Sequence, residues 1–275
     1  MDGAVSRAGN ASVGSDRPGA VGKVVRVVEA LSSHTGVTEI SRATGLPTST
    51  VHRIIQDLGA FGWVRSDGEH GYLPGVGLLT LAARAESEAG VITRARPLLE
   101  RLRDETTHTV HFALRQGDEA IYVAKIDGRR AYEMRSRVGL GIRLHSTAIG
   151  KALLAALPET EVRAILNRTG LPAMTSQTIT DLDEMMRHLR AIARCGYSID
   201  DQENEEHTRC IGAAVRDHRG LAIGGISLSA MAFEVDEASV HQRASLVLAT
   251  AREVSVELGY RPASTPADGR MPRTG

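Results

Sequence analysis

The feature that most constrains the fold is a pair of short helical patterns joined by a turn. Residues 38–43 fit a short helix, and a second, longer helix follows it. Gly45 lies between them, where helices often end on a left-handed residue. The segment therefore predicts two helices that meet at a tight turn, the second with one buried face. The apolar residues of that face are Val51, Ile54, Ile55, Leu58 and Phe61.

Two further patterns flank this pair. Before it, apolar residues at helical spacing predict a helix over Val21–Leu31. After it, Trp63-Val64-Arg65 and Gly71-Tyr72-Leu73 enclose an Asp67-Gly68 turn signal, which predicts a short β-hairpin. Such a hairpin, or wing, completes a winged helix-turn-helix. In helix-turn-helix proteins the first residues of the second helix enter the major groove of DNA.

The polar face of the second helix carries side chains that suit nucleic acid. Its hydroxyl groups fit phosphate contacts, Arg53 suits a guanine edge, and Gln56 suits adenine. A polar helix face is most often simply solvated, so the order of helix, turn, helix and wing is what favours DNA binding. The candidate DNA-binding residues are Arg42, Thr48, Ser49, Thr50, His52, Arg53, Gln56 and Arg65.

Composition limits how the chain can bind DNA and where it works. Lys and Arg together number 33, and so do Asp and Glu. Without an overall positive charge, DNA binding requires Arg42, Arg53 and Arg65 to lie on one side. Cys195 and Cys210 form no CxxC pair and fit a reducing compartment. No signal peptide or membrane span is evident, so we expect a cytoplasmic protein without membrane contact.

The rest of the chain predicts a larger α+β domain, because strands and helices segregate rather than alternate strictly. At 275 residues the chain is long enough for two domains. We expect disordered tails at 1–19 and 261–275, a winged helix-turn-helix at 20–75, a linker helix at 76–90 and the larger domain at 91–260. Its predicted helices are Val91–Glu105, Thr147–Leu157, Glu159–Arg168, Asp181–Arg194 and Asp236–Leu258. Its predicted strands are Val110–Leu114, Ala120–Ile126, Ala131–Arg137, Tyr197–Asp200, Arg209–Val215 and Leu221–Leu228, in an antiparallel sheet.

Several segments resemble the IclR family of bacterial transcriptional regulators. In the first half these are Glu39–Arg53, Gly62–Asp67 and Tyr72–Gly75. In the second half they are Leu144–Ala155, Gly196–Glu203 and Ile226–Ser229, so the likeness covers nearly everything between the two tails. The resemblance implies a winged helix-turn-helix joined to a GAF-like effector-binding domain. It also implies assembly as homodimers or tetramers, and control of a catabolic or stress operon by a small organic ligand.

Ser146 and Thr147 precede a predicted helix whose start offers backbone N–H groups to an anion such as a carboxylate. From this segment alone, an ordinary capped helix with Gly150 placed for packing is the better interpretation. The resemblance shifts that balance, because it places Ala148 where the family's effector meets helix backbone. It also assigns Asp200, Cys210, Ser227 and Ser229 to the polar part of the pocket, and Ala131 and Met134 to its apolar wall.

The sequence departs from the family around this pocket. His207 stands where a glycine is usual, Ala214 where a proline is usual, and Ala230-Met231 where a Gly-Pro pair is usual. We expect His207 either to narrow the pocket or to add a donor, and we include it among the effector-binding candidates. These changes bear on which effector is bound rather than on the fold. His145, Asp200, His207 and Cys210 match no zinc spacing, so no metal or other cofactor is expected.

Three classes of function compete for this sequence. The favoured one is a DNA-binding regulator, most simply a repressor of a catabolic operon, that binds an inverted-repeat operator and responds to a small organic acid. An enzyme is disfavoured, because the sequence has no nucleophile elbow, HExxH or P-loop motif. The alternative is a signalling module that binds a nucleotide or another small molecule without using DNA, and the wing argues against it.

Overall fold

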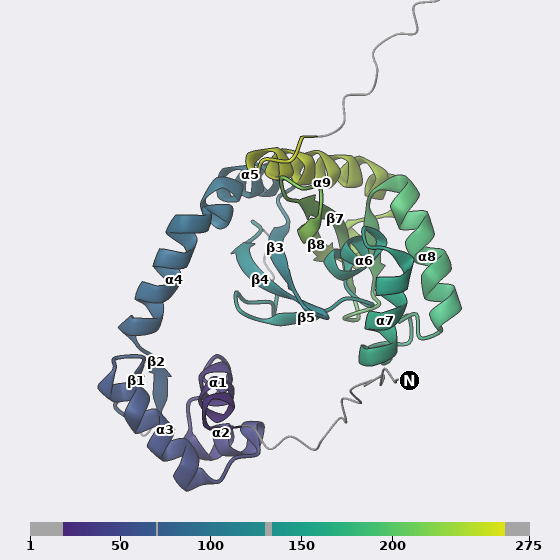
Figure 1. Cartoon of the computed structure of the whole chain (residues 1–275). Coiled ribbons are helices and arrows are strands. Elements are labelled where there is room, and N and C mark those ends of the chain that lie inside the picture. Colours follow the sequence, from purple (N-terminus) through teal and green to yellow (C-terminus); the bar gives the residue numbers. More distant parts are fainter. Residues whose placement is uncertain (1–18, 70, 130–133, 262–275) are drawn as a thin grey trace, which may run out of the picture. The chain divides into compact units, whose positions relative to one another are not determined.

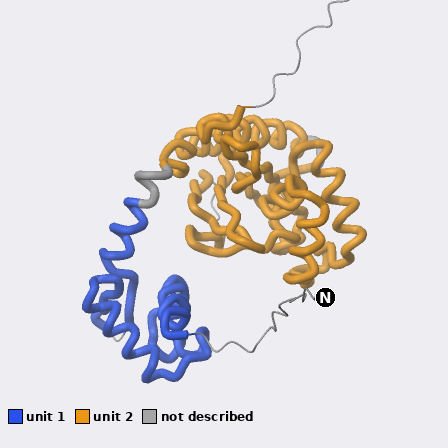
Figure 2. The backbone as a smooth tube through the Cα atoms, in the orientation of Figure 1, with its two compact units in different colours: residues 1–88 blue, residues 89–275 orange. Residues whose placement is uncertain are grey.

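The computed structural model describes residues 19–69, 71–129 and 134–261. The chain divides into two compact units, residues 1–88 and 89–275, which Figure 2 draws in different colours. The expected tails fall almost entirely outside the described residues. Each unit is described by itself below.

The first unit is a winged helix-turn-helix. It contains α1 (Ala20–Ala30), α2 (Val37–Thr44), α3 (Thr48–Ala60), β1 (Val64–Ser66), β2 (Tyr72–Pro74) and α4 (Val76–Ala89). One face of each of α1, α2 and α3 packs into a shared apolar core that includes Val27, Ile40 and Ile55. Gly45 has the left-handed φ of 68° that was predicted for the turn, and Ser41 Oγ fastens the turn by donating to the Leu46 carbonyl at 2.6 Å.

The wing is a short antiparallel hairpin that is tied to the loop between α1 and α2. β1 pairs with β2 so that Arg65 lies opposite Leu73. Asp67 Oδ1 accepts from the backbone N–H groups of Glu69 and Gly71 at 2.8 and 2.7 Å, which closes the hairpin turn. The Tyr72 N–H donates to the Thr35 carbonyl at 2.9 Å, so the wing is tied to the loop between α1 and α2.

The second unit is an α+β fold around an antiparallel sheet, as predicted (Figure 1). In its described part the strand order is β5-β4-β3-β8-β7-β6. The strands are β3 (Thr109–Gln116), β4 (Glu119–Ile126), β5 (Gly141–Arg143), β6 (Ser198–Asp201), β7 (Thr208–Arg216) and β8 (Ala222–Met231). The helices are α5 (Val91–Thr106), α6 (Ala148–Ala155), α7 (Glu159–Thr169), α8 (Leu182–Cys195) and α9 (Glu237–Glu257), with a short 3-10 turn η1 (Ala232–Glu234).

The two faces of the sheet pack against different helices because side chains alternate along each strand. On one face, Ile226 and Leu228 of β8 pack with residues of α5 and α9 such as Leu99 and Val247. On the other face, the apolar core includes residues of α6, α7 and α8. Ser227 and Ser229 belong to this second face, where α6 covers part of the sheet (Figure 1).

One predicted strand is wrong where it can be assessed. Ala131–Arg137 was expected to be a strand, and residues 130–133 of it lie outside the description. Residues 134–137 form no strand, and the edge strand β5 lies further on, at Gly141–Arg143. Met134 and Ser136 are held through other bonds: Lys125 Nζ donates to the Met134 carbonyl at 2.9 Å, and Ser136 Oγ bonds His111 Nε2 at 2.6 Å. Met134 and Ser136 are therefore held by side-chain bonds from β4 and β3 rather than by pairing in the sheet.

Candidate functional sites

The polar face of α3 is open to solvent along its length. Thr48, Ser49, His52, Arg53 and Gln56 are exposed and Thr50 is half-buried. The opposite face, which includes Val51, Ile54 and Leu58, is buried in the core of the unit. The sequence pattern therefore produces a helix with one anchored face and one free polar face, which is what insertion into a groove requires.

Three exposed arginines belong to the same unit. Arg42 lies in the last turn of α2, Arg53 on the free face of α3, and Arg65 on the wing strand β1. None of the three forms an ion pair within the described residues. Their charges are therefore not compensated by neighbouring acids, although the chain as a whole carries no net charge.

The second unit holds a cavity of about 250 Å³ between the sheet and the start of α6. Its lining combines apolar side chains with a few polar groups, as is typical of sites for small molecules. Six of the predicted effector-binding residues lie in this lining: Met134, Ala148, Asp200, Cys210, Ser227 and Ser229. Ala131 lies outside the described residues, and His207 does not line the cavity.

The polar residues converge because the strands pair in register. Asp200 of β6 lies opposite Cys210 of β7, and Cys210 lies opposite Ser229 of β8. One step along the same face, Gly212 lies opposite Ser227, which lies opposite His111 of β3. These side chains therefore form two adjacent rows on the sheet face below the cavity.

The start of α6 closes the cavity from above. Thr147 is the N-cap: its Oγ1 accepts from the Gly150 N–H at 3.1 Å and donates to the Arg143 carbonyl at 2.6 Å. This leaves the backbone N–H groups of Ala148 and Ile149 at the positive end of the helix. Gly150 has a packing role as well, because a Cβ atom there would lie 2.4 Å from the Leu144 Cα.

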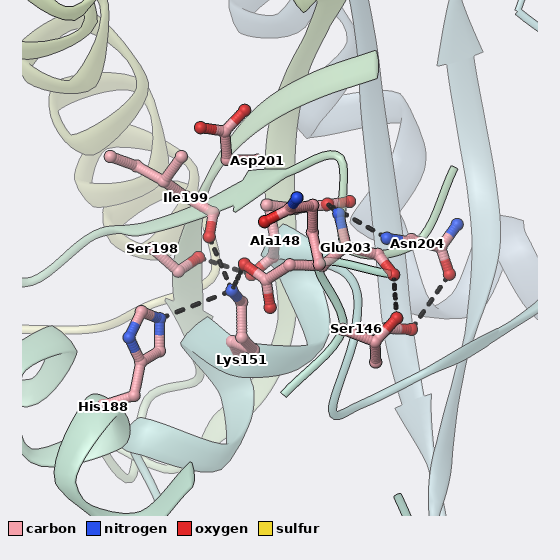
Figure 3. A network of polar contacts seen from close by, with 12 residues as sticks. Ser146, Ala148, Lys151, His188, Ser198, Ile199, Asp201, Glu203 and Asn204 are labelled. Carbon is pink, nitrogen blue, oxygen red and sulfur yellow. Dashed lines mark hydrogen bonds and ion pairs between the residues drawn. The ribbon is translucent and has the colours of Figure 1, made fainter. Parts of the chain in front are cut away.

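Behind this helix start lies a buried polar network centred on Lys151 (Figure 3). The Lys151 side chain is fully buried, and its Nζ donates to the Ile199 carbonyl at 2.6 Å and to Glu203 Oε1. His188 Nε2 lies 3.4 Å from the same ammonium group. Burial, together with the nearby Lys151 charge, lowers the pKa of His188 to about 4, so this imidazole is neutral at pH 7.

Two aromatic rings that sequence reasoning did not assign to the pocket also line the cavity. His111 and Tyr122 pack with their ring centroids 4.8 Å apart. Burial lowers the pKa of His111 to about 3, so the ring is neutral, and burial raises the pKa of Tyr122. His111 connects a chain of bonds, in which Cys210 Sγ donates to Ser229 Oγ at 3.1 Å and Ser229 Oγ lies 3.3 Å from His111 Nδ1.

His207 plays a backbone role. Its side chain is exposed and its φ is +64°, in the left-handed region that favours glycine. Its N–H donates to Gln202 Oε1 at 3.2 Å and its carbonyl accepts from the Ala232 N–H at 2.7 Å. The residue therefore shapes the turn that carries Asn204 and Glu205, two further lining residues that sequence reasoning missed.

The described residues hold neither a candidate metal site nor a candidate membrane span. No three His, Cys, Asp or Glu side chains in this part of the chain come together as a potential metal site. Among the helices described, none has the length and apolar content needed to cross a membrane.

Comparison with family models matches both units. Residues 20–68 match the IclR helix-turn-helix domain, and residues 83–256 match the C-terminal domain of the bacterial transcriptional regulator IclR. The chain is 33% identical over 248 residues to the HTH-type transcriptional regulator KdgR of Dickeya chrysanthemi, covering 89% of this chain and 81% of KdgR. It is 31% identical over 240 residues to the HTH-type transcriptional repressor AllR of Klebsiella pneumoniae, covering 87% and 88%.

Solved structures show the same fold. The Thermotoga maritima IclR structure aligns with a TM-score of 0.69 and 29% identity, covering 87% of this chain and 98% of that one. An IclR homologue from Microbacterium hydrocarbonoxydans, solved in complex with 4-hydroxybenzoate, aligns with a TM-score of 0.75 and 22% identity, covering 86% and 97%.

Proposed function

The chain belongs to the IclR family of DNA-binding transcriptional regulators, which are not enzymes, and we propose that it is a repressor controlled by a small organic acid. In this proposal it binds an inverted-repeat operator of a catabolic operon, in the cytoplasm where the chromosome lies. The acid binds in the cavity of the second unit and changes the affinity for DNA. The observation that carries the proposal is the convergence of Asp200, Ser227, Ser229 and the α6 start on one cavity.

The DNA contacts are assigned to α3 and the wing. The residues proposed to contact DNA are Arg42, Thr48, Ser49, Thr50, His52, Arg53, Gln56 and Arg65. The exposure of the α3 face and the unpaired charges of the three arginines support this assignment. Arg53, near the start of α3, is assigned to a base edge, and Arg65, on the wing, to the phosphate backbone.

Assembly as a dimer, or as a tetramer built from dimers, is expected because one helix-turn-helix contacts only half of an operator. Apolar side chains that the isolated unit leaves exposed favour α1 and α4 as the pairing surface. Val21 on α1 is 77% exposed and Leu79 on α4 is 64% exposed, with Val25 and Leu81 also exposed. Burial of such residues against a second copy would be stabilising.

The cavity suits a small acid that carries a second polar group. The free N–H groups at the α6 start and the hydroxyls of Ser227 and Ser229 would hold a carboxylate. The rings of His111 and Tyr122, tilted by 35° to each other, add aromatic surface to the lining, so an aromatic acid fits as well as an aliphatic one. The homologue solved with 4-hydroxybenzoate gives a precedent for an aromatic hydroxy-acid in this fold. We propose that binding acts on DNA affinity through the linker helix α4.

The test is a thermal-shift screen of the full chain with 4-hydroxybenzoate, lactate, 3-hydroxybutyrate and 2-oxobutanoate, against glucose and AMP. At least one acid should raise the melting temperature, and the Ser227→Ala, Ser229→Ala double variant should lose that shift. A double variant of exposed serines, Ser176→Ala with Ser245→Ala, is the matched control and should keep it. The pocket assignment fails if only glucose or AMP stabilises the protein, or if the cavity variant retains full affinity for the acid.

A further inference from the structure

Asp200 is a carboxyl group in the wall of a cavity that should receive an anion. Its side chain is only 3% exposed. Oδ1 accepts the backbone N–H groups of Glu203 at 2.8 Å and Asn204 at 3.2 Å. Oδ2 accepts no hydrogen bond from the described residues, and the side chain lines the cavity. One oxygen is therefore anchored, and the other remains for a ligand or a proton.

The nearest buried cation is already engaged. Lys151 pairs with Glu203 Oε1 and also donates to the Ile199 carbonyl (Figure 3). Glu203 is itself only 6% exposed, and its Oε2 is buried without a hydrogen-bond partner among the described residues. Lys151 therefore balances the Glu203 carboxylate. If Asp200 is ionised as well, the buried cluster of Lys151, Glu203 and Asp200 carries one uncompensated negative charge.

The other ionisable groups around Asp200 do not supply a compensating buried charge. The Cys210 thiol and the Tyr122 phenol are neutral because burial raises the pKa of each. The His111 imidazole is neutral because burial lowers its pKa to about 3. Arg135 and Arg143 at the cavity rim are exposed, and Arg135 lies 3.9 Å from Glu205. Asp201 points away from the cluster in Figure 3 and pairs with Arg209. The ionisable groups in the cavity wall and in the neighbouring polar network are Lys151, His188, Glu203, Glu205, Cys210, Tyr122, His111, Arg135, Arg143 and Asp201.

A carboxylate bound at the α6 start would thus lie on the same sheet face as a second carboxylate. α6 rests on Gly212, and Asp200 is the cross-strand partner of Cys210, one step along that face. If both carboxylates were ionised they would repel each other across one partly buried cavity, which disfavours the charged form of Asp200. Burial already raises the pKa of Asp200 to about 7, so protonating it near neutral pH requires little free energy.

We propose that the cavity takes up its anionic effector together with one proton from solvent, held between Asp200 Oδ2 and the ligand. The proton turns Asp200 into a hydrogen-bond donor toward the anion, and no other bond forms or breaks. This inference rests on the proposed function, because it presumes an organic acid in the cavity. The simpler alternative is an ionised Asp200 that only accepts a hydrogen bond from a ligand hydroxyl, and it involves no proton uptake.

The experiment is titration calorimetry of the full chain with whichever acid of the screen gives the largest thermal shift. Binding is measured at about pH 8 in two buffers of different ionisation enthalpy, HEPES and Tris, so that the difference in heat counts protons. We expect uptake of about one proton per acid, and a fall in affinity of about tenfold per pH unit above neutrality. At about pH 5.5, where Asp200 is already protonated, uptake should approach zero.

The variants assign the proton. Asp200→Asn keeps an acceptor for the two backbone N–H groups and adds a permanent donor, so it should bind the acid at about pH 8 without proton uptake. Asp201→Asn, the exposed neighbour, should behave as wild type. Proton uptake near zero in wild type at about pH 8, or uptake that persists in Asp200→Asn, overturns this inference alone. Failure of every acid to bind overturns the proposed effector class and this inference with it.

Discussion

Gly212 of β7 lies directly beneath Ala148, the first residue of α6: a Cβ atom on Gly212 would lie 2.7 Å from the Ala148 carbonyl carbon. The same atom would lie 2.9 Å from the Ile149 nitrogen. The helix start that closes the cavity therefore rests on the bare backbone of the sheet. The position of the N–H groups offered to a ligand depends on the absence of a side chain at this point.

The first prediction is that Gly212→Ala displaces the start of α6. The added methyl group meets backbone, which cannot move aside cheaply, so the free energy of unfolding should fall by about 1–3 kcal/mol. Affinity for the acid should fall as well. Gly59→Ala in α3 is the control. Its Cβ would lie 3.8 Å from the nearest atom outside the helix, the Val64 carbonyl oxygen, and alanine favours a helix. Urea unfolding measures the stability of both variants, and equal losses of stability in Gly212→Ala and Gly59→Ala would refute the packing argument.

The second prediction concerns the turn at His207. Because an L-residue with φ of +64° is strained, His207→Gly should raise the free energy of unfolding by about 0.5–1 kcal/mol. Acid affinity should stay within about twofold, since the imidazole does not line the cavity. His218→Gly, at an exposed position without positive φ, should lower stability instead. A loss of acid affinity in His207→Gly would show instead that the imidazole contributes to binding of the acid.

The third prediction is a pH dependence of stability without ligand. Burial raises the pKa of Asp200 from 3.8 to about 7 in the folded chain, so the folded state binds more protons than the unfolded state between these values. The stability contributed by the protonated carboxyl is therefore present below about pH 4 and lost as pH rises through about 7. Asp200→Asn removes this loss, so at about pH 8 it should be more stable than wild type, on the order of 4 kcal/mol.

At about pH 5.5 the gain from Asp200→Asn should be smaller. The pKa of Glu203 is raised too, again chiefly by burial, so its contribution has the same sign and remains in the variant. Urea unfolding of wild type and variant at both pH values gives the comparison. A difference that does not grow with pH would show that Asp200 is ionised in the folded protein throughout.

The predictable part of the site is the part encoded in local patterns. Ser227 and Ser229 alternate with Ile226 and Leu228, so a strand must place the two serines on one face and the apolar pair on the other. Thr147 preceding an apolar helix likewise indicates an N-cap, and the structure places it there. Each of these features needs only the period of one element.

The unpredicted part depends on contacts between distant strands. His111 and Tyr122 stand in strongly apolar strands, where they resemble core residues. His111 meets Ser229 only because β3 pairs with β8, across 118 positions of sequence. A glycine at the position of His207 is a signal for a backbone with positive φ. The replacement by histidine is easily interpreted as a new side-chain function instead. Its positive φ decides the matter.

The fourth prediction separates base contacts from backbone contacts. On a DNA site selected from random sequences by the wild-type chain, Arg53→Ala should cost about 1–3 kcal/mol and relax preference at one base position. Arg65→Ala should weaken selected and random DNA alike and reduce the slope of affinity against salt by about one. Competition binding at several salt concentrations measures both effects. The assigned face of α3 is wrong if Arg53→Ala binds both kinds of DNA as wild type does.

The most direct test of the account is the DNA affinity of the full chain, measured by fluorescence anisotropy on its selected site with and without the acid from the screen. We predict that saturating acid changes the dissociation constant by about 5–150-fold, a coupling of about 1–3 kcal/mol. The Ser227→Ala, Ser229→Ala variant should bind the same DNA as wild type does without acid, and should not respond. An acid that binds the cavity tightly yet leaves DNA affinity unchanged, or a full response in that variant, would contradict control of α3 through this cavity.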